Sequence, residues 1–197
     1  GNLFVPKGAK GIVLFAHGSG SGRFSPRNNY VAKVLQKANI ATLLMDLLTK
    51  EEETIDMVTG HLRFDIDMLA DRLTAATWWV KKNSKTKKLA IGYFGASTGA
   101  GAALMAAAKL DGIYAVVSRG GRPDLAGHHL AKVKAPTLLV VGGNDDVVID
   151  LNKQAMKQLH CENKLEIVPG AMHLFEEPGK LEEVAKLAAE WFVKHLK

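Results

Sequence analysis

The sequence predicts a three-layer α/β fold, in which a mostly parallel sheet of about six or more strands is covered by helices on both faces. The main observation is an alternation along the chain between short apolar segments and longer segments whose apolar residues recur every three or four positions. Such alternation is typical of strand–helix–strand units, whose strands pair in parallel. The apolar segments are also nearly continuous, so we expect both faces of each strand to be buried.

Six short apolar segments are the predicted strands. Residues 11–16 read Gly-Ile-Val-Leu-Phe-Ala, a run that favours a strand, and a glycine-rich loop follows it directly. The second segment, residues 40–45, is closed by Asp46. The remaining predicted strands are residues 89–94, 114–117, 137–141 and 164–168.

Four segments have the composition and spacing of helices. They are residues 30–38, 63–82, 99–110, which are rich in Ala, and 181–196. The polar, acidic stretch at residues 50–53 is interpreted as a connection between the second strand and the longest helix. Trp78 and Trp79 are adjacent in that helix and cannot face the same side, so we expect one of them to be partly exposed.

The composition is that of one folded domain spanning residues 1–197. Hydrophobic residues make up 47% of the chain and the net charge is +6, which argues against disorder. No apolar run approaches the roughly 18 residues that a spanning helix needs, so we expect no membrane association. The first apolar stretch is too short for a signal peptide. Cys161 is the single cysteine and cannot form an internal disulfide, which leads us to expect a cytoplasmic protein.

The chain is basic, with a sequence pI of about 9.4. Much of the excess charge comes from five lysines at positions 81, 82, 85, 87 and 88, where the longest helix is expected to end. Cations at that end of a helix complement its dipole. No aromatic residue interrupts the run, so we interpret it as a solvated face and expect no nucleic-acid partner.

A Gly-x-Ser-x-Gly motif, Gly95-Ala96-Ser97-Thr98-Gly99, lies between a predicted strand and a predicted helix. In this context the serine occupies a tight turn that lifts its hydroxyl above the sheet. The two glycines leave room for strand and helix to pass closely, and the start of the helix offers free N–H groups to a developing negative charge. The alternative is an inactive turn of small residues, so the motif needs partners to indicate catalysis.

Candidate partners for Ser97 follow two later strands. A serine nucleophile needs a base, and the base needs a carboxylate that orients it. Because the carboxyl ends of parallel strands meet at one rim of the sheet, we expect a histidine and an aspartate from this rim to lie beside Ser97. The segments concerned are Gly142-Gly143-Asn144-Asp145-Asp146-Val147-Val148 and Ala171-Met172-His173.

Together with Ala16-His17-Gly18-Ser19-Gly20, these motifs resemble the α/β-hydrolase superfamily and, within it, the dienelactone hydrolase-like group. The likeness extends from about residue 11 to residue 197. It implies that Ser97 is the nucleophile, His173 the general base and Asp145 the acid, because the family places the acid two residues before a Val-Val pair. Asp146, the other candidate acid, would then cap a loop or face solvent.

The resemblance also implies an oxyanion hole formed by the N–H groups of Thr98 and Ser19, with Gly20 the next choice for the latter. His17 would support that loop. The chain departs from the family in two ways. Dienelactone hydrolase itself has a cysteine nucleophile where Ser97 stands here, and the strands that usually precede the His-Gly strand are absent or truncated. Lactone hydrolysis is therefore not inherited with the fold.

We therefore predict a serine hydrolase that acts on a small ester, lactone or related acyl substrate through a Ser-His-Asp triad and an acyl-enzyme intermediate. No cofactor is needed, and no His or Cys pair has convincing metal-ligand spacing. The loop at residues 17–22 reads G-x-G-x-G rather than G-x-G-x-x-G, which disfavours a dinucleotide site. No long insertion forms a large lid. Two alternatives stay open: an acyltransferase, thioesterase or peptidase with the same triad, and a non-catalytic binding domain.

Four arginines follow predicted strands on the same rim, namely Arg23, Arg27, Arg119 and Arg122. A guanidinium group there would bind a carboxylate or phosphate of an anionic substrate, and we favour Arg23 and Arg119 for this role. The alternative is that the arginines pair with Asp46, Asp124 or the acidic residues 51–53 and brace the loops.

Overall fold

Six of the seven strands run parallel, and β1 at one edge runs antiparallel to its neighbour β3. The computed structural model describes residues 1–197 and orders the strands β1-β3-β2-β4-β5-β6-β7. All six predicted strands are present within two residues of the expected bounds, and only the three-residue β1, too short to show a pattern, is additional. The strands are β1 (Asn2–Phe4), β2 (Gly11–Ala16), β3 (Ala41–Leu44), β4 (Ala90–Ala96), β5 (Ile113–Arg119), β6 (Thr137–Gly142) and β7 (Asn163–Val168).

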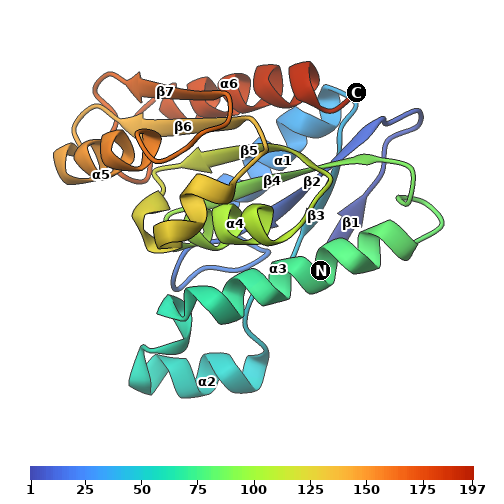
Figure 1. Ribbon diagram of the computed structural model, residues 1–197, viewed down its shortest axis with the longest axis horizontal. Coiled ribbons are helices and arrows are strands. Elements are labelled where there is room, and N and C mark those ends of the chain that lie inside the picture. Colours follow the sequence, from blue (N-terminus) through green and yellow to red (C-terminus); the bar gives the residue numbers. More distant parts are fainter.

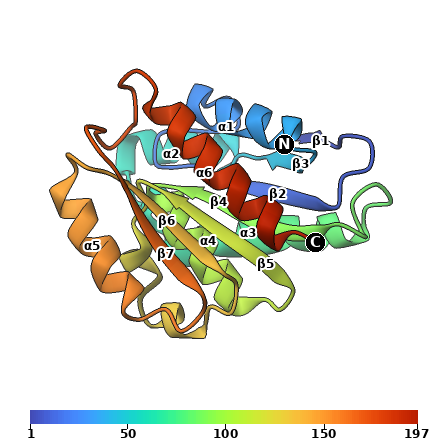
Figure 2. The ribbon, with the colours of Figure 1, turned by 90° about the horizontal axis from the view of Figure 1, so that it is seen from above.

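Helices cover both faces of the sheet, which confirms the three-layer architecture (Figure 1). Seen from above, α1 and α6 lie side by side over one face (Figure 2). The other face is covered by α3, α4, α5 and the 3-10 segment η2. No helix is both long enough and apolar enough to cross a bilayer. The bounds are α1 (Pro26–Lys37), α3 (Ile66–Lys82), α4 (Thr98–Lys109), η2 (Pro123–Lys132), α5 (Asp146–Met156) and α6 (Lys180–His195).

Burial of both sheet faces explains why a central strand such as β2 is apolar along its whole length. The edge strand β7 departs from the expectation, because it contains Lys164 and Glu166 and is only partly buried. In β2, Ile12 and Leu14 belong to an apolar cluster under α3 and α4, whereas Val13 and Phe15 belong to a cluster under α1 and α6. These four residues are at most 1% exposed. Full burial of an aliphatic or aromatic side chain stabilises the fold by roughly 1.5–3 kcal/mol. A polar residue on either face of this strand would therefore be costly.

The stretch after residue 49, which the sequence suggests is a connection, is instead a ten-residue helix, α2 (Lys50–Thr59). Thr49 caps it, because its hydroxyl accepts a bond from the Glu52 N–H and the Glu52 carboxylate accepts one from the Thr49 N–H. Gly60 ends it with a φ of 67°. Asp56 is the single buried residue of α2. The apolar residues of α2 face solvent and form no stripe toward the core, so the segment has no apolar periodicity that predicts a helix.

The longest predicted helix is divided near its start. Asp65 accepts a hydrogen bond from the Met68 N–H at 3.0 Å and caps α3, and the preceding residues form the short 3-10 segment η1 (Leu62–Phe64). Trp78 and Trp79 are 50% and 48% exposed, so both of them, rather than one, are partly exposed. Helix α5 is also additional to the predicted elements.

Candidate active site

Ser97 lies in a sharp turn between β4 and α4. Its φ of 51° and ψ of −124° are strained for a residue with a side chain, at a cost of about 1–3 kcal/mol. Three backbone hydrogen bonds hold this conformation. The Ser97 N–H donates to the Arg119 carbonyl at 3.2 Å, and the Ser97 carbonyl accepts from the N–H groups of Ala100 and Arg122, both at 3.0 Å. Hydrogen bonds to neighbouring elements thus fix the hydroxyl at the rim of the sheet.

The glycines of the Gly-x-Ser-x-Gly motif are required by packing. A Cβ at Gly99 would lie 2.2 Å from the Ala16 carbonyl oxygen, and a Cβ at Gly95 would lie 2.4 Å from the Cα of Ala100. Real side chains do not approach backbone atoms this closely. The two glycines therefore allow α4 to start directly against β2 and β4, with Ser97 at the turn between them.

The structure brings His173 and Asp145 to Ser97 from the ends of β7 and β6. His173 Nε2 is 3.4 Å from Ser97 Oγ, and His173 Nδ1 is 2.7 Å from Asp145 Oδ2. An Nδ1–H that donates to the carboxylate leaves Nε2 as an acceptor facing the serine hydroxyl. Asp146 is the first residue of α5 and makes no such contact, so the carboxylate beside the imidazole is that of Asp145.

The loop after β2 passes directly over Ser97. A Cβ at Gly18 would be 3.1 Å from the Ser97 Cβ, and the Ser19 N–H donates to the Thr98 hydroxyl at 3.0 Å. The Thr98 N–H is at the start of α4, where a helix offers amides without an acceptor of its own. The Ser19 N–H, one of the two expected oxyanion donors, is therefore already bound by the Thr98 hydroxyl, and the spacing of the motifs does not reveal this hydrogen bond.

His17 anchors that loop to the end of β3. It is 7% exposed; its Nδ1 lies 2.9 Å from the Gly18 carbonyl oxygen, and its Nε2 accepts the Leu47 N–H at 2.9 Å. The Leu47 bond requires a lone pair on Nε2, so the ring is neutral with its proton on Nδ1. Burial lowers the pKa of His17, while its bond to Gly18 and the nearby Asp46 act in the opposite direction.

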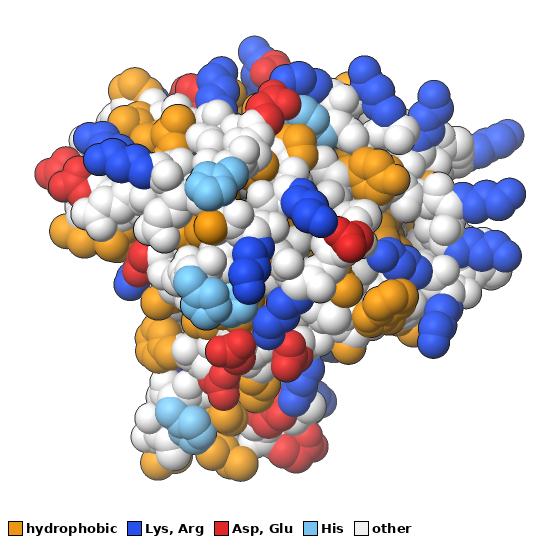
Figure 3. Space-filling model, viewed as in Figure 1, with side chains coloured by type: hydrophobic (Ala, Val, Ile, Leu, Met, Phe, Trp, Pro, Cys, Tyr) orange, Lys and Arg blue, Asp and Glu red, His pale blue; other side chains and the backbone are white.

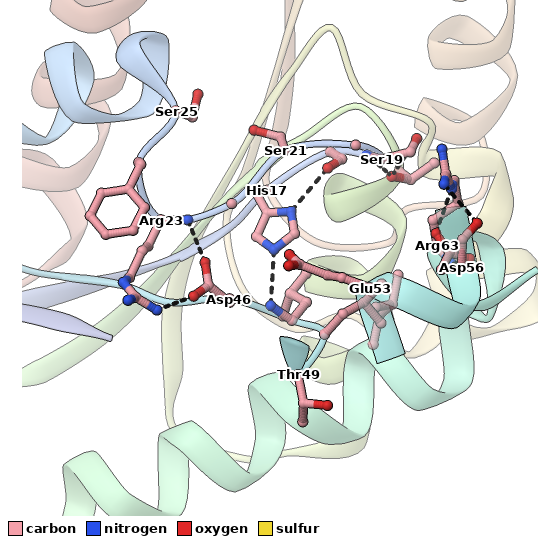
Figure 4. A pocket seen from close by; sticks show the side chains of 18 of the residues that line it. His17, Ser19, Ser21, Arg23, Ser25, Asp46, Thr49, Glu53, Asp56 and Arg63 are labelled. Carbon is pink, nitrogen blue, oxygen red and sulfur yellow. Dashed lines mark hydrogen bonds and ion pairs between the residues drawn. The ribbon is translucent and has the colours of Figure 1, made fainter. Parts of the chain in front are cut away.

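A cavity of about 820 Å³ opens beside Ser19 and Thr98 and extends toward α2. Five of the 22 residues that line it are hydrophobic, so its wall is largely polar. Figure 4 shows two ion pairs in this wall, Arg23 with Asp46 and Arg63 with Asp56. No cluster of three or more His, Cys, Asp or Glu side chains in the chain is arranged to hold a metal ion.

Three of the four rim arginines have a carboxylate partner. Arg23 pairs with Asp46 through both its side chain and its backbone N–H, so one of the two favoured substrate arginines is already engaged. Arg122 forms a two-pronged pair with the carboxylate of Asp124 at 2.9 and 2.7 Å. Arg27 contacts Glu176 at 2.7 Å.

Arg119 is the exception. It is 6% exposed, its closest partner is the Leu174 carbonyl oxygen at 3.5 Å from Nη1, and its Nε has no partner. Burial, and then the neighbouring Arg27, lower the pKa of Arg119 to about 10. Leu174 directly follows His173, so this unpaired guanidinium lies beneath the loop that carries the imidazole.

Gly120 was not among the expected site residues, yet it allows the histidine loop to approach β5. Its φ is 48°, and a Cβ there would lie 2.9 Å from the His173 carbonyl oxygen. Phe175, on the loop that carries His173, also has a positive φ, of 57°, and its fully buried side chain holds it there. The Gly-Gly pair after β5 is the only sequence signal of this close approach.

Comparisons with known proteins agree with this architecture. The chain is 62% identical to a dienelactone hydrolase of Anabaena variabilis, whose crystal structure superimposes with a TM-score of 0.97 over 99% of this chain and 91% of that one. Est1E of Butyrivibrio proteoclasticus shares the fold at 18% identity, with a TM-score of 0.80 over 98% of this chain and 92% of that one.

A curated protein of Mycobacterium tuberculosis strain H37Rv, named "Putative phosphoribosyl transferase", is 58% identical over all 197 residues. The chain spans 44% of the length of that relative, so the relative's name describes a much longer protein. The model of the dienelactone hydrolase family matches residues 3–196, which is nearly the whole chain. This chain therefore belongs to the dienelactone hydrolase family.

Proposed function

We propose that the chain is a serine hydrolase that cleaves small esters, lactones or related acyl compounds through an acyl-enzyme intermediate. The observation that carries the proposal is the alignment of three side chains from three strand ends. Ser97 Oγ is 3.4 Å from His173 Nε2, and His173 Nδ1 is 2.7 Å from Asp145 Oδ2. Membership in the dienelactone hydrolase family supports hydrolysis as the reaction class.

In the proposed mechanism, His173 Nε2 takes the proton of the Ser97 hydroxyl as Oγ attacks the acyl carbon. Asp145 holds the ring with Nδ1–H toward the carboxylate and stabilises the imidazolium that forms. His173 then gives its proton to the leaving oxygen, which departs as an alcohol. A water molecule, deprotonated by the same nitrogen, attacks the acyl-enzyme, and the acid is released as His173 returns the proton to Ser97 Oγ.

The negative oxygen of the tetrahedral intermediate would be bound by the N–H groups of Thr98 and Ser19. For the Ser19 N–H to bind the oxyanion, the Thr98 hydroxyl must turn away from it, since the N–H donates to that hydroxyl at 3.0 Å in the free protein. This exchange replaces a neutral acceptor by a charged one. Hydrogen bonds to a charged group are roughly twice as strong as neutral ones, which favours the exchange when the oxyanion forms.

The acyl substrate is proposed to carry a negative charge, which Arg119 would bind. A buried guanidinium without a carboxylate partner is unfavourable unless an anion completes it. Arg119 is 6% exposed, has no carboxylate partner and has an Nε without a hydrogen-bond partner. Arg23 is left out of this role because Asp46 neutralises it.

A fluorophosphonate probe and a set of short-chain acyl esters test the hydrolase proposal. We expect the probe to label Ser97 at neutral pH, and Ser97→Ala to lower ester turnover by at least about 1,000-fold. Ser84→Ala, an exposed serine between α3 and β4, is the matched control and should keep full turnover. Absence of labelling, together with equal ester turnover by the wild type and Ser97→Ala, would leave the non-catalytic binding domain as the better description.

A further inference from the structure

A second hollow lies at the opposite end of the sheet from Ser97. It has a volume of about 660 Å³ and is bounded by the end of α3, the starts of β4 and β5, and the segment before β2. Strand β4 separates the two ends, because Ala90 lines the hollow and Ala96 adjoins Ser97. At about 3.3 Å per residue, this separation is roughly 20 Å. The hollow is therefore a different place from the hydrolase site.

Its lining consists of lysines and apolar groups. Of the 11 residues, five are lysines, five are hydrophobic and one is Gly112, and no Asp or Glu is among them. Figure 3 shows basic side chains crowded at this end of the molecule, along the right-hand edge of the view. We call this region the lysine hollow, and its lysines are Lys10, Lys81, Lys87, Lys88 and Lys197.

These lysines lack the ion pairs that other lysines of the chain have. Seven lysines elsewhere have a carboxylate oxygen within 4.0 Å, and none of the seven lines the hollow. Lys81 Nζ donates to the backbone carbonyl of Asp111 at 3.2 Å, whereas the Asp111 carboxylate is bound by Lys134 at 3.0 Å. Several ammonium groups thus share one concave surface without a counter-charge.

The rest of the lining suits a planar, apolar group. Tyr114 is 49% exposed at the start of β5, and Leu89, Ala90 and Ile91 contribute to the same wall. Pockets that hold small ligands and cofactors have volumes of about 300–1,000 Å³ and combine an apolar wall with a few charged groups. A ligand that matches both parts carries several negative charges at one end and an aromatic ring at the other.

We propose that the lysine hollow binds a nucleoside polyphosphate. The phosphate chain lies across Lys81, Lys87 and Lys88, which act as point charges for its oxygens. The base packs on the ring of Tyr114. The solvated lysine face expected from the sequence thereby becomes a specific anion site, because the fold adds Lys10, Lys197 and an aromatic ring that lie far from the lysine run in the sequence.

Isothermal titration calorimetry of the whole chain with ATP, tripolyphosphate and adenosine tests the proposal, at about 50 mM salt so that screening is weak. We expect ATP to bind with 1:1 stoichiometry and adenosine to bind at least about tenfold more weakly, because it lacks the charged chain. The triple variant Lys81→Gln, Lys87→Gln and Lys88→Gln should weaken ATP binding by about tenfold or more, with an unchanged melting temperature.

The matched control removes three exposed, unpaired lysines outside the hollow, in the triple variant Lys33→Gln, Lys37→Gln and Lys132→Gln. It should bind ATP like the wild type. Tyr114→Ala should weaken ATP binding and leave tripolyphosphate binding unchanged. Equal losses in both triple variants would show attraction by net charge alone and overturn the proposal. Absence of ATP binding to the wild type would overturn it as well, and an equal effect of Tyr114→Ala on both ligands would overturn the assignment of the base. Each outcome is independent of ester hydrolysis at Ser97.

Discussion

Replacing Arg119 by Met is expected to stabilise the free protein and, at the same time, to weaken the proposed hydrolysis of anionic esters. Burial lowers the pKa of Arg119 to about 10, from an ordinary value above about 12. Each pKa unit corresponds to about 1.4 kcal/mol, so holding the charged guanidinium at this position costs the folded state on the order of 3 kcal/mol. Met has a flexible apolar stem that fills the same space.

The substitution removes few stabilising contacts. It removes one weak contact, from Nη1 to the Leu174 carbonyl oxygen at 3.5 Å. A typical hydrogen bond contributes about 1 kcal/mol, so we expect the free energy of unfolding to rise by about 1–2 kcal/mol. For a chain of this size that corresponds to an increase in melting temperature of about 2–8 °C. Urea denaturation and thermal melting measure both quantities.

The kinetic half of the prediction uses two esters of the same phenol, a hemisuccinate and a butyrate, which differ mainly in charge. A hydrogen bond to a charged group contributes about 1.5–3 kcal/mol, so Arg119→Met should raise KM for the anionic ester by about tenfold to a hundredfold. KM for the neutral ester should change by less than about twofold, because Arg119 makes no contact that a neutral acyl group needs. Anionic product should also raise the melting temperature of the wild type and leave that of the variant unchanged.

Arg122→Met is the matched control, because Arg122 is paired with the carboxylate of Asp124 and is partly exposed. Its loss should change stability by no more than about 0.5–1 kcal/mol and should not alter the preference between the two esters. The reasoning is wrong if Arg119→Met lowers stability by more than about 1 kcal/mol and raises KM equally for both esters. Arg119 would then be a brace for the histidine loop.

Three further predictions concern the site and the core. Asp145→Asn should lower kcat for ester hydrolysis by about 10³–10⁴-fold with little change in KM, since the imidazole loses the carboxylate that orients it. Asp146→Asn is the control and should keep kcat within about threefold. Equal losses of kcat in the two variants would reopen the choice of acid. Burial holds the pKa of His17 below the 6.5 of the unfolded chain, so the unfolded state takes up the proton first as pH falls. The free energy of unfolding should therefore decrease below pH 6.5, and His17→Gln should show a smaller decrease in urea titrations at successive pH values. Tyr93→Phe removes a buried 2.6 Å hydrogen bond between the hydroxyls of Tyr93 and Thr77. It should lower the free energy of unfolding, measured by urea denaturation, by about 1–2 kcal/mol. An unchanged urea midpoint would mean that this bond adds nothing to stability.

The parts of the fold that the sequence predicts are those with a dense local signal. Residues 11–16 are apolar at every position, and this continuity predicts a strand buried on both faces because each alternate side chain must meet a different apolar layer. Gly95 and Gly99 flank Ser97 at the spacing that a strand-to-helix turn needs, and the contacts of a Cβ at either position explain why. Helix α2 is missed because its apolar residues point to solvent, so a short capping signal at Thr49 is all that marks it.

By itself, the sequence determined which segments are strands and which serine, aspartates and histidine follow those strands along the chain. It did not determine which groups meet, since contacts across strands depend on distances that spacing does not encode. The tertiary structure decided that Asp145 rather than Asp146 reaches His173, and that Thr98 occupies the Ser19 N–H. It also decided that Asp46 neutralises Arg23 while Arg119 is buried without a carboxylate. The physical reason is the same in each case: charge compensation and burial are properties of neighbours in space, and those neighbours come from different strand ends.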